Sequence, residues 1–137
     1  MKKEVHRSAG IFLIRGVLGI IFMMQGFGKV FKWGLDNVYA SSFASYEGTL
    51  PKFLLWLTVY YTSFVELIGG ALLLLGLMRY WAAFALGIVL LIVSFGHGLT
   101  QPIWDLQHVF PRTVLLAAFL LLPKEWDRWH LDGLFRK

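Results

Sequence analysis

The chain of 137 residues contains no cysteine, and only 15% of its residues are charged. Without cysteine it cannot form a disulfide, and it has no thiolates for an iron–sulfur cluster. It also lacks the His and Cys spacing of a zinc site and the glycine-rich loop of a nucleotide-binding βαβ unit, so we expect no bound metal. The low charge and the 58% of apolar residues exclude a disordered chain and an ordinary soluble enzyme.

Apolar sequence is what the chain has in excess. A protein this short cannot bury so much apolar surface in one core, so the surplus must face lipid. Four apolar stretches cover about residues 8–31, 53–76, 81–100 and 106–123. The first three are long enough for a helix to cross the hydrocarbon core, which takes about 20 residues. The fourth must extend back to residue 106 or thin the bilayer, with Pro111 at a kink or in its first turn.

The predicted fold class is therefore all-α, an integral membrane four-helix bundle that forms a single domain over residues 1–137. A membrane β-barrel is disfavoured because runs such as Ala71–Leu75 do not alternate between apolar and polar residues. The link between the second and third spans, Leu77–Tyr80, is short, so these two helices should pack as an antiparallel hairpin.

The distribution of Lys and Arg predicts the orientation. With four spans both termini share one side, which carries eight of the 13 basic residues; four lie on the other side and Arg15 lies within a span. Basic loops stay in the cytoplasm, so we expect both termini there and a location in the cell inner membrane. The net charge of +5 then reflects topology and attraction to anionic lipid, and we expect no nucleic-acid partner.

The positions of the tryptophans agree with this orientation. Three lie near the outer ends of spans: Trp33, Trp56 and Trp104. The other three lie near the inner ends: Trp81, Trp126 and Trp129.

Two connecting segments are longer than turns. Residues 32–52 form an outer loop in which apolar residues recur at helical spacing, which predicts a short interfacial helix or a lid. The tail, 124–137, mixes tryptophans with charges and is predicted to lie as an amphipathic segment on the cytoplasmic surface.

Polar residues inside the spans are the functional candidates, because an ionisable group in hydrocarbon is costly. In the first span, Arg15 and Lys29 lie on one helical stripe with two glycines, Gly19 and Gly26, and Gln25 lies beside it. The glycines let another helix approach closely, so this stripe should face protein.

Glu66 lies near the centre of the second span, and Arg15 is its expected partner because its long side chain starts about one turn away in depth. Two interpretations stay open. The pair only fixes the register of two helices, or Glu66 handles protons or binds a ligand.

His97 lies at the outer end of the third span, where it is either a proton carrier or an interfacial histidine that is satisfied locally. His97 and His108 together could ligate haem, but no haem attachment motif is present and haem is disfavoured.

Two motifs in these spans resemble the DoxX family. The first runs from Arg15 to Gly19 and on through Gln25–Phe31, and the second runs from Glu66 to Leu77 and is followed by Arg79. Many members of the family have a histidine where this chain has Gln25. The resemblance covers about residues 9–100 and implies a four-helix membrane protein of a family linked with respiratory chains or sulfur oxidation. That family includes a thiosulfate:quinone oxidoreductase subunit and members of membrane redox-stress complexes, although nothing in this sequence handles sulfur.

Two functions follow as hypotheses, and the sequence leaves open whether the protein is an enzyme. In the first, it is a quinone- or lipid-binding subunit associated with a membrane redox system. Its polar cavity would be lined by the candidate residues Arg15, Gln25, Lys29, Glu66 and His97. In the second, it is a non-catalytic accessory or assembly subunit whose buried polar residues are structural. The expected partners are membrane lipid, quinone and other membrane or redox subunits.

Overall fold

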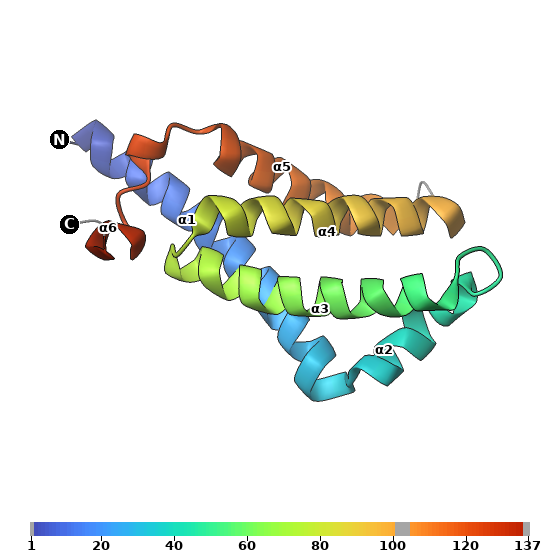
Figure 1. The fold of residues 1–137 in the computed structure, drawn as a ribbon. Coiled ribbons are helices and arrows are strands. Elements are labelled where there is room, and N and C mark those ends of the chain that lie inside the picture. Colours follow the sequence, from blue (N-terminus) through green and yellow to red (C-terminus); the bar gives the residue numbers. More distant parts are fainter. Residues whose placement is uncertain (1, 101–104, 136–137) are drawn as a thin grey trace.

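This computed structural model describes residues 2–100 and 105–135, and the regular elements of that part are all helices. Four long helices form the bundle: α1 (Lys2–Phe27), α3 (Lys52–Leu75), α4 (Arg79–Thr100) and α5 (Val109–Leu121). The shorter segments are η1 (Gly28–Trp33), a π-helical continuation of α1, then α2 (Leu35–Ser42), η2 (Ala44–Tyr46), η3 (Asp105–His108), η4 (Lys124–Trp126) and α6 (Asp132–Phe135). Both termini lie at one end of the bundle, here called the tail end, and α2 lies toward the other, the loop end (Figure 1).

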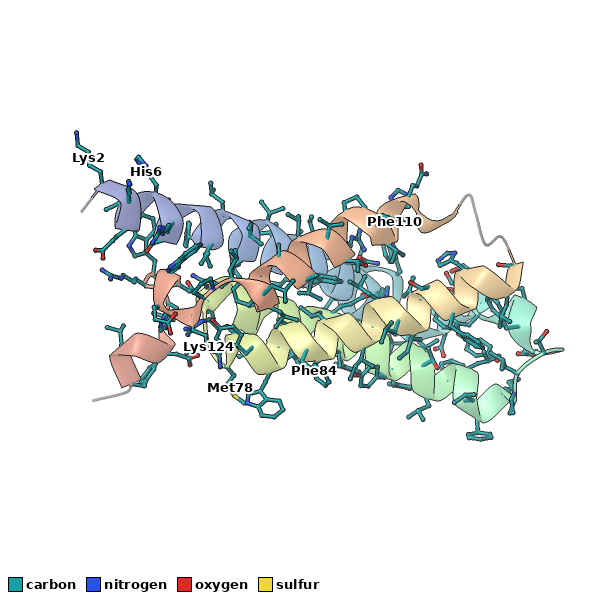
Figure 2. The ribbon with its side chains drawn as sticks, turned by 90° about the horizontal axis from the view of Figure 1, so that it is seen from above. Lys2, His6, Met78, Phe84, Phe110 and Lys124 are labelled. Carbon is teal, nitrogen blue, oxygen red and sulfur yellow. The ribbon has the colours of Figure 1, made fainter. Side chains whose placement is uncertain are left out.

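The helices have the length and composition of membrane spans. Three qualify by both criteria, Lys2–Trp33, Lys52–Leu75 and Arg79–Thr100, and Val109–Leu121 is a shorter apolar helix. Large apolar side chains project away from the bundle, among them Phe84 and Phe110, which are 59% and 65% exposed (Figure 2). The predicted four-helix membrane bundle is confirmed, and the protein crosses the membrane more than once.

The ends of the helices differ little from the predicted spans. The first helix begins earlier than expected, at Lys2, and the fourth begins at Val109. Pro111 falls in the first turn of α5, where the missing N–H breaks no helical hydrogen bond. The prediction for Trp104 concerns a residue outside the described part of the chain.

α1 packs most closely against α3, and three glycines make this contact. A Cβ on Gly26 would lie 2.6 Å from Leu67 Cα, and one on Gly70 would lie 2.8 Å from Met23 Cα. Gly19 lies in the same way against Leu74. Because helix backbones approach this closely only where the side chains are very small, these contacts fix one antiparallel register between the two helices. The predicted stripe of the first span therefore faces protein.

The main core continues from this contact to α4 and α5. Its fully buried members include Leu18, Phe22, Leu73, Leu86 and Phe119. A smaller core forms at the loop end, where Val38 and Tyr39 of α2 pack against Leu55 and Val59 of α3. α2 is thus held beneath the first half of α3 by buried apolar side chains.

The α3–α4 hairpin turns on Gly76, whose φ of +71° places it in the left-handed region that suits glycine. Glycine is needed here for space as well, because a Cβ would lie 2.6 Å from Arg15 Nη1 and equally close to His130 Cβ. The turn thus leaves room for two side chains that arrive from α1 and from the tail.

The close contact between α1 and α3 can be tested by adding a methyl group to one of its glycines. We expect Gly70→Ala to lower the free energy of unfolding by about 1–3 kcal/mol, because the new methyl group meets the backbone of α1. Gly16→Ala is the matched control, since nothing lies within 4 Å of a Cβ there. We expect this variant to be as stable as the parent or slightly more stable. Unfolding in detergent micelles measures both, and equal stability of the two variants would contradict the register described above.

Candidate functional site

Glu66 forms an ion pair with Lys29 near the middle of the bundle. Lys29 Nζ lies 2.7 Å from Glu66 Oε2, and the two side chains are 14% and 1% exposed. One turn before Glu66 on the same face of α3, the fully buried Ser63 hydroxyl has no hydrogen-bond partner within the described chain. Lys29 also lines an open pocket beside α2, so its side chain connects the buried carboxylate with the surface.

A second cation reaches this region from α5. Arg112 Nη1 donates a hydrogen bond of 2.7 Å to Gln25 Oε1, and the guanidinium lies over the ring of Phe22. Gln25, Lys29, Glu66 and Arg112 are called the central cluster below. It contains two cations and one carboxylate, so its formal charge is +1.

The predicted pair of Arg15 with Glu66 is wrong. In the antiparallel register set by the glycines, Glu66 lies opposite Phe27. Arg15 is twelve residues from that point, about 18 Å along the helix axis at 1.5 Å per residue. Lys29, two residues beyond Phe27, takes its place.

Arg15 lies instead at the tail end, where it caps α3. Its Nη1 donates hydrogen bonds of 2.9 Å to the carbonyl oxygens of Leu73 and Leu74, which belong to the last turn of that helix. The last carbonyls of a helix carry the negative end of its dipole, so a guanidinium stabilises them, also at Leu73, whose carbonyl already accepts a hydrogen bond of 3.2 Å from the Gly76 N–H. Arg15 Nη2 also donates to the carbonyl of Trp129 in the tail.

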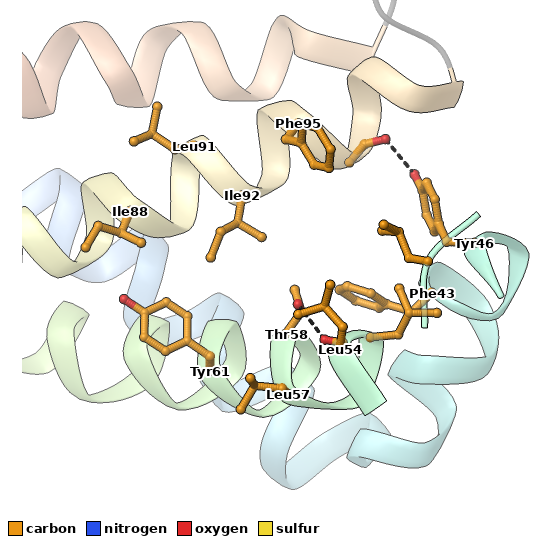
Figure 3. A pocket seen from close by; sticks show the side chains of 13 residues that line it. Phe43, Tyr46, Leu54, Leu57, Thr58, Tyr61, Ile88, Leu91, Ile92 and Phe95 are labelled. Atoms are coloured by element: carbon orange, nitrogen blue, oxygen red, sulfur yellow. Dashed lines mark hydrogen bonds between the residues drawn. The ribbon is translucent and has the colours of Figure 1, made fainter. Parts of the chain in front are cut away.

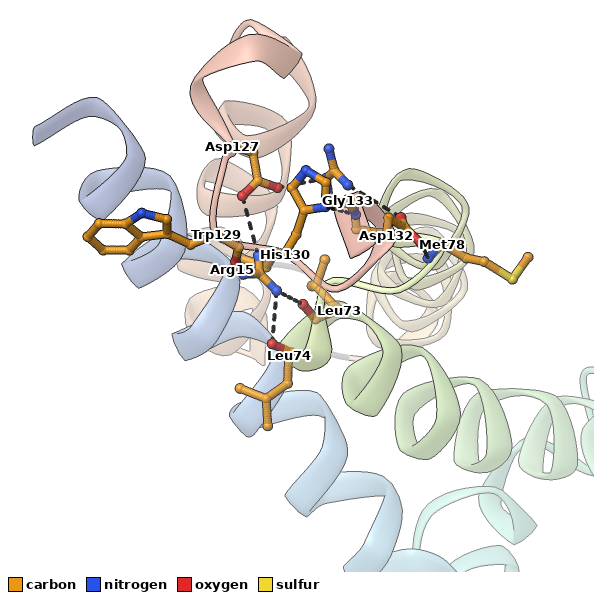
Figure 4. Close-up of polar contacts among 10 residues, drawn as sticks. Arg15, Leu73, Leu74, Met78, Asp127, Trp129, His130, Asp132 and Gly133 are labelled. Carbon is orange, nitrogen blue, oxygen red and sulfur yellow. Dashed lines mark hydrogen bonds and ion pairs between the residues drawn. The ribbon is translucent and has the colours of Figure 1, made fainter. Parts of the chain in front are cut away.

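The tail end holds a second set of buried charges, the tail cluster, made of Arg15, Arg79 and Asp127. Figure 4 shows Arg15 and Asp127 side by side. Asp127 is 2% exposed; its Oδ2 lies 2.7 Å from Arg79 Nε and its Oδ1 lies 3.8 Å from Arg15 Nε. Asp132 adds a carboxylate that pairs with Arg79 at 3.3 Å and accepts a hydrogen bond from the Met78 N–H. The tail is therefore folded into the end of the bundle and is more than the surface segment that we predicted.

His130 lies against this cluster. Burial and the neighbouring Arg79 guanidinium lower the pKa of its imidazole. The neutral imidazole accepts a hydrogen bond of 3.0 Å from the Gly133 N–H, which turns the chain into α6. His130 therefore adds no third cation to the two arginines.

His97, the last of the five candidates, is half-buried in the final turn of α4. The structure thus brings together Gln25, Lys29 and Glu66, and it places Arg15 in a separate cluster. Across residues 2–100 and 105–135, no three His, Asp or Glu side chains are grouped as metal ligands.

Three residues of these clusters, Arg79, Arg112 and Asp127, were not among the sequence candidates, although Arg79 follows the second family motif. Arg112 is an ionisable residue at the edge of the fourth apolar stretch, and that position was a signal that could have identified it. Asp127 is one of several charges in a polar segment, and nothing in the sequence distinguishes it.

A large apolar pocket of about 680 Å³ opens between α3 and α4 at the loop end (Figure 3). Its floor and walls include Leu57, Ile88 and Ile92, and η2 closes it where Tyr46 donates a hydrogen bond of 3.0 Å to the Gly96 carbonyl. Neither Glu66 nor His97 lines this pocket. The predicted cavity lined by all five candidates is therefore not this one.

Tyr61 lines the pocket, and its ring extends from α3 toward Ile88 of α4 (Figure 3). The only other side-chain hydroxyls in the lining belong to Tyr46 and to Thr58, which donates to the Leu54 carbonyl at 2.8 Å. No residue of the described chain forms a hydrogen bond with the Tyr61 hydroxyl. The pocket thus offers an apolar volume with one unpaired donor in its wall.

The sequence model of the DoxX family matches residues 10–98, which include most of α1, all of α2 and α3, and nearly all of α4. No curated protein and no solved structure shows a significant match to the chain. The matched region contains Lys29, Glu66 and the pocket, and it excludes Arg112 and the tail.

The Lys29–Glu66 ion pair can be tested by removing one partner and then both. We expect Lys29→Met to lower the free energy of unfolding by about 3 kcal/mol, because it leaves a buried carboxylate without its ion-pair partner. Adding Glu66→Met should restore most of that loss, because the double variant buries no unpaired charge.

The matched control is the same double-mutant cycle with Arg15→Met in place of Lys29→Met. Chemical unfolding in detergent micelles should give strong coupling for the first pair and additive losses for the second. The reverse result would support the pairing first predicted from the sequence.

Proposed function

Because the chain belongs to the DoxX family, we propose that it is a membrane subunit that binds a quinone and is associated with a membrane redox system. The resemblance discussed above links this family with quinone oxidoreduction. The observation that supports the proposal here is the unpaired Tyr61 hydroxyl in the apolar pocket between α3 and α4.

The position of Tyr61 favours a quinone over a phospholipid. Tyr61 lies about 14 Å along α3 from its first residue, well inside a hydrocarbon core of about 30 Å. The polar atoms of a phospholipid stay at the interface, whereas an isoprenoid quinone carries its ring carbonyls into the hydrocarbon. A quinone carbonyl would accept the hydrogen bond of Tyr61, and the apolar lining would bury the ring and part of its chain.

The central cluster enters this proposal as the proton-handling group. Reduction of a quinone takes up two protons, and a buried carboxylate connected to the surface through Lys29 can exchange them. Gln25 and Arg112 would set the electrostatics around Glu66, and His97 is a further candidate on α4.

A second candidate function is that of a non-catalytic accessory subunit. It is favoured by the ion pairs, because Arg15, Lys29 and Arg79 all have acidic partners within this chain. In that case the buried charges would only hold the helices in place.

Binding of decylubiquinone to the detergent-purified protein tests the proposal. We expect Tyr61→Phe to weaken binding about fivefold, the value of one neutral hydrogen bond. Ile92→Trp should weaken binding further, because the indole takes up space in the part of the pocket between α3 and α4. Leu121→Trp is the control; Leu121 is 84% exposed on α5 and does not line the pocket.

If all four proteins bind the quinone equally, the ligand does not occupy this pocket. If none binds it, and organic extracts of the purified parent contain no quinone by mass spectrometry, the accessory function is favoured.

We also propose that the protein lies in the inner membrane with both termini in the cytoplasm. The excess of Lys and Arg on the side of the termini supports this orientation. The tail cluster would then lie at the cytoplasmic end of the bundle and α2 at the outer end.

Cysteine labelling tests the orientation, since the parent chain has no cysteine. An impermeant maleimide added to intact spheroplasts should label Ser45→Cys, in η2, and should label Glu125→Cys only after the membrane is opened. Both positions are exposed. The opposite pattern would reverse the orientation.

A further inference from the structure

A second pocket, of about 820 Å³, lies at the loop end beside α2 and has a different chemical character. It is separate from the apolar pocket, because the small core of Val38, Tyr39, Leu55 and Val59 lies between them, with Val38 in the wall of one and Leu55 in the wall of the other. The lining of this second pocket combines two lysines, a tryptophan, an amide and two hydroxyls: Lys29, Lys32, Trp33, Asn37, Ser41 and Ser42.

The π-helical turn η1 supplies the cationic wall. Lys29 and Lys32 both lie on η1, and the ring of Trp33 folds back onto Gly28, where a Cβ would lie 3.3 Å from it. Lys29 is held by Glu66, but Lys32 is exposed and has no ion-pair or hydrogen-bond partner within residues 2–100 and 105–135. The indole N–H of Trp33 is likewise unpaired within that part of the chain.

The opposite wall, on α2, supplies neutral polar groups. Asn37 donates a hydrogen bond of 2.7 Å to the Trp33 carbonyl, which joins α2 to η1. The hydroxyls of Ser41 and Ser42 lie 3.3 Å apart, and Ser41 also donates to the Val38 carbonyl. The Asn37 bond joins the two walls, whereas the serine contacts stay within α2.

No carboxylate lines this pocket. The acids nearest the pocket have other neighbours. Glu66 is buried behind Lys29. Glu47 accepts a hydrogen bond of 2.7 Å from Tyr39, and its carboxylate lies 3.8 Å from Lys52 Nζ. Asp36 is exposed on the first turn of α2. The pocket therefore presents a positive charge that this chain does not neutralise from within the lining.

The pocket also lies at the depth of the lipid headgroups. Trp33 is the last residue of a segment long and apolar enough to cross the membrane, and it is 53% exposed. Exposed tryptophan and lysine together are typical of the boundary between hydrocarbon and water. Phe31, 67% exposed beside them, would face acyl chains.

We propose that this pocket binds a phosphate group, carried by an anionic phospholipid. Lys32 would pair with the phosphate, and the Trp33 indole and a serine hydroxyl would donate hydrogen bonds to its oxygens. The lipid tails would lie against Phe31. Free phosphate has the same recognition chemistry, and the two sources are separated by experiment.

Native mass spectrometry of the full-length protein in detergent tests this site, with dioleoylphosphatidylglycerol and dioleoylphosphatidylcholine as the two probes. The parent should bind phosphatidylglycerol more tightly, since it lacks the compensating amine of phosphatidylcholine. Lys32→Gln should weaken phosphatidylglycerol binding about fivefold, the value of one lysine at an anionic surface, and should not change phosphatidylcholine binding. Lys32 is exposed and unpaired, so the variant should fold normally.

Lys52→Gln is the matched control, because Lys52 is an exposed lysine at the same end of the bundle that does not line the pocket. It should bind phosphatidylglycerol as the parent does. Equal affinity of the Lys32 and Lys52 variants, or a parent without preference for phosphatidylglycerol, would overturn the proposal.

A further arm adds inorganic phosphate and measures the melting temperature. In one outcome, inorganic phosphate raises the melting temperature of the parent but not of Lys32→Gln, while phosphatidylglycerol raises neither. That result would support the phosphate site and identify free phosphate as its source. Stabilisation by phosphatidylglycerol alone would identify the lipid.

Discussion

The backbone contact between α1 and α3 determines where Arg15, Lys29 and Glu66 find their partners. Gly19, Gly26 and Gly70 bring the two helices together without intervening side chains, so the register between them cannot slip without a clash. That register sets Lys29 beside Glu66 and leaves Arg15 at the end of α3, beside its last carbonyls. A different register would leave charges unpaired in a medium that does not solvate them.

Both clusters place buried charges beside groups of opposite charge, but with different partners. At the tail end, Arg79 forms ion pairs with two carboxylates of the tail. Arg15 pairs with one of these carboxylates and donates hydrogen bonds to three backbone carbonyls. In the central cluster, Lys29 and Arg112 share one carboxylate and one amide oxygen. In the tail cluster each charged side chain has an oppositely charged neighbour, and Asp132 brings the formal charge to zero, as expected of a structural site. The central cluster keeps a surplus positive charge and a lysine that reaches a surface pocket, and both features are typical of a site that responds to a ligand or a proton.

The sequence was sufficient to predict the spans, because hydropathy over about 20 residues depends on composition and needs no knowledge of packing. It also predicted that the glycine stripe of the first span faces protein. It did not predict the partner of Glu66, because counting residues from the membrane surface gives depth but not the crossing angle or the register of two helices. Asp127 could not be predicted either, since a carboxylate in a polar tail is ordinarily solvated, and only the fold back onto Arg15 and Arg79 buries it. The apolar pocket depends on how α3 and α4 diverge, which their sequences do not encode locally.

The order in which the chain is made gives the tail a further consequence. Arg79 has two acidic partners, Asp127 and Asp132. Both lie after the fourth helix, so they leave the ribosome after every membrane helix has been synthesised. Until then the end of the α3–α4 hairpin carries a guanidinium without its counter-ions, and the last turn of α3 lacks the support of a fully anchored Arg15. Assembly of this bundle is therefore completed from its C-terminal end, with the tail closing a structure whose membrane helices are already in place.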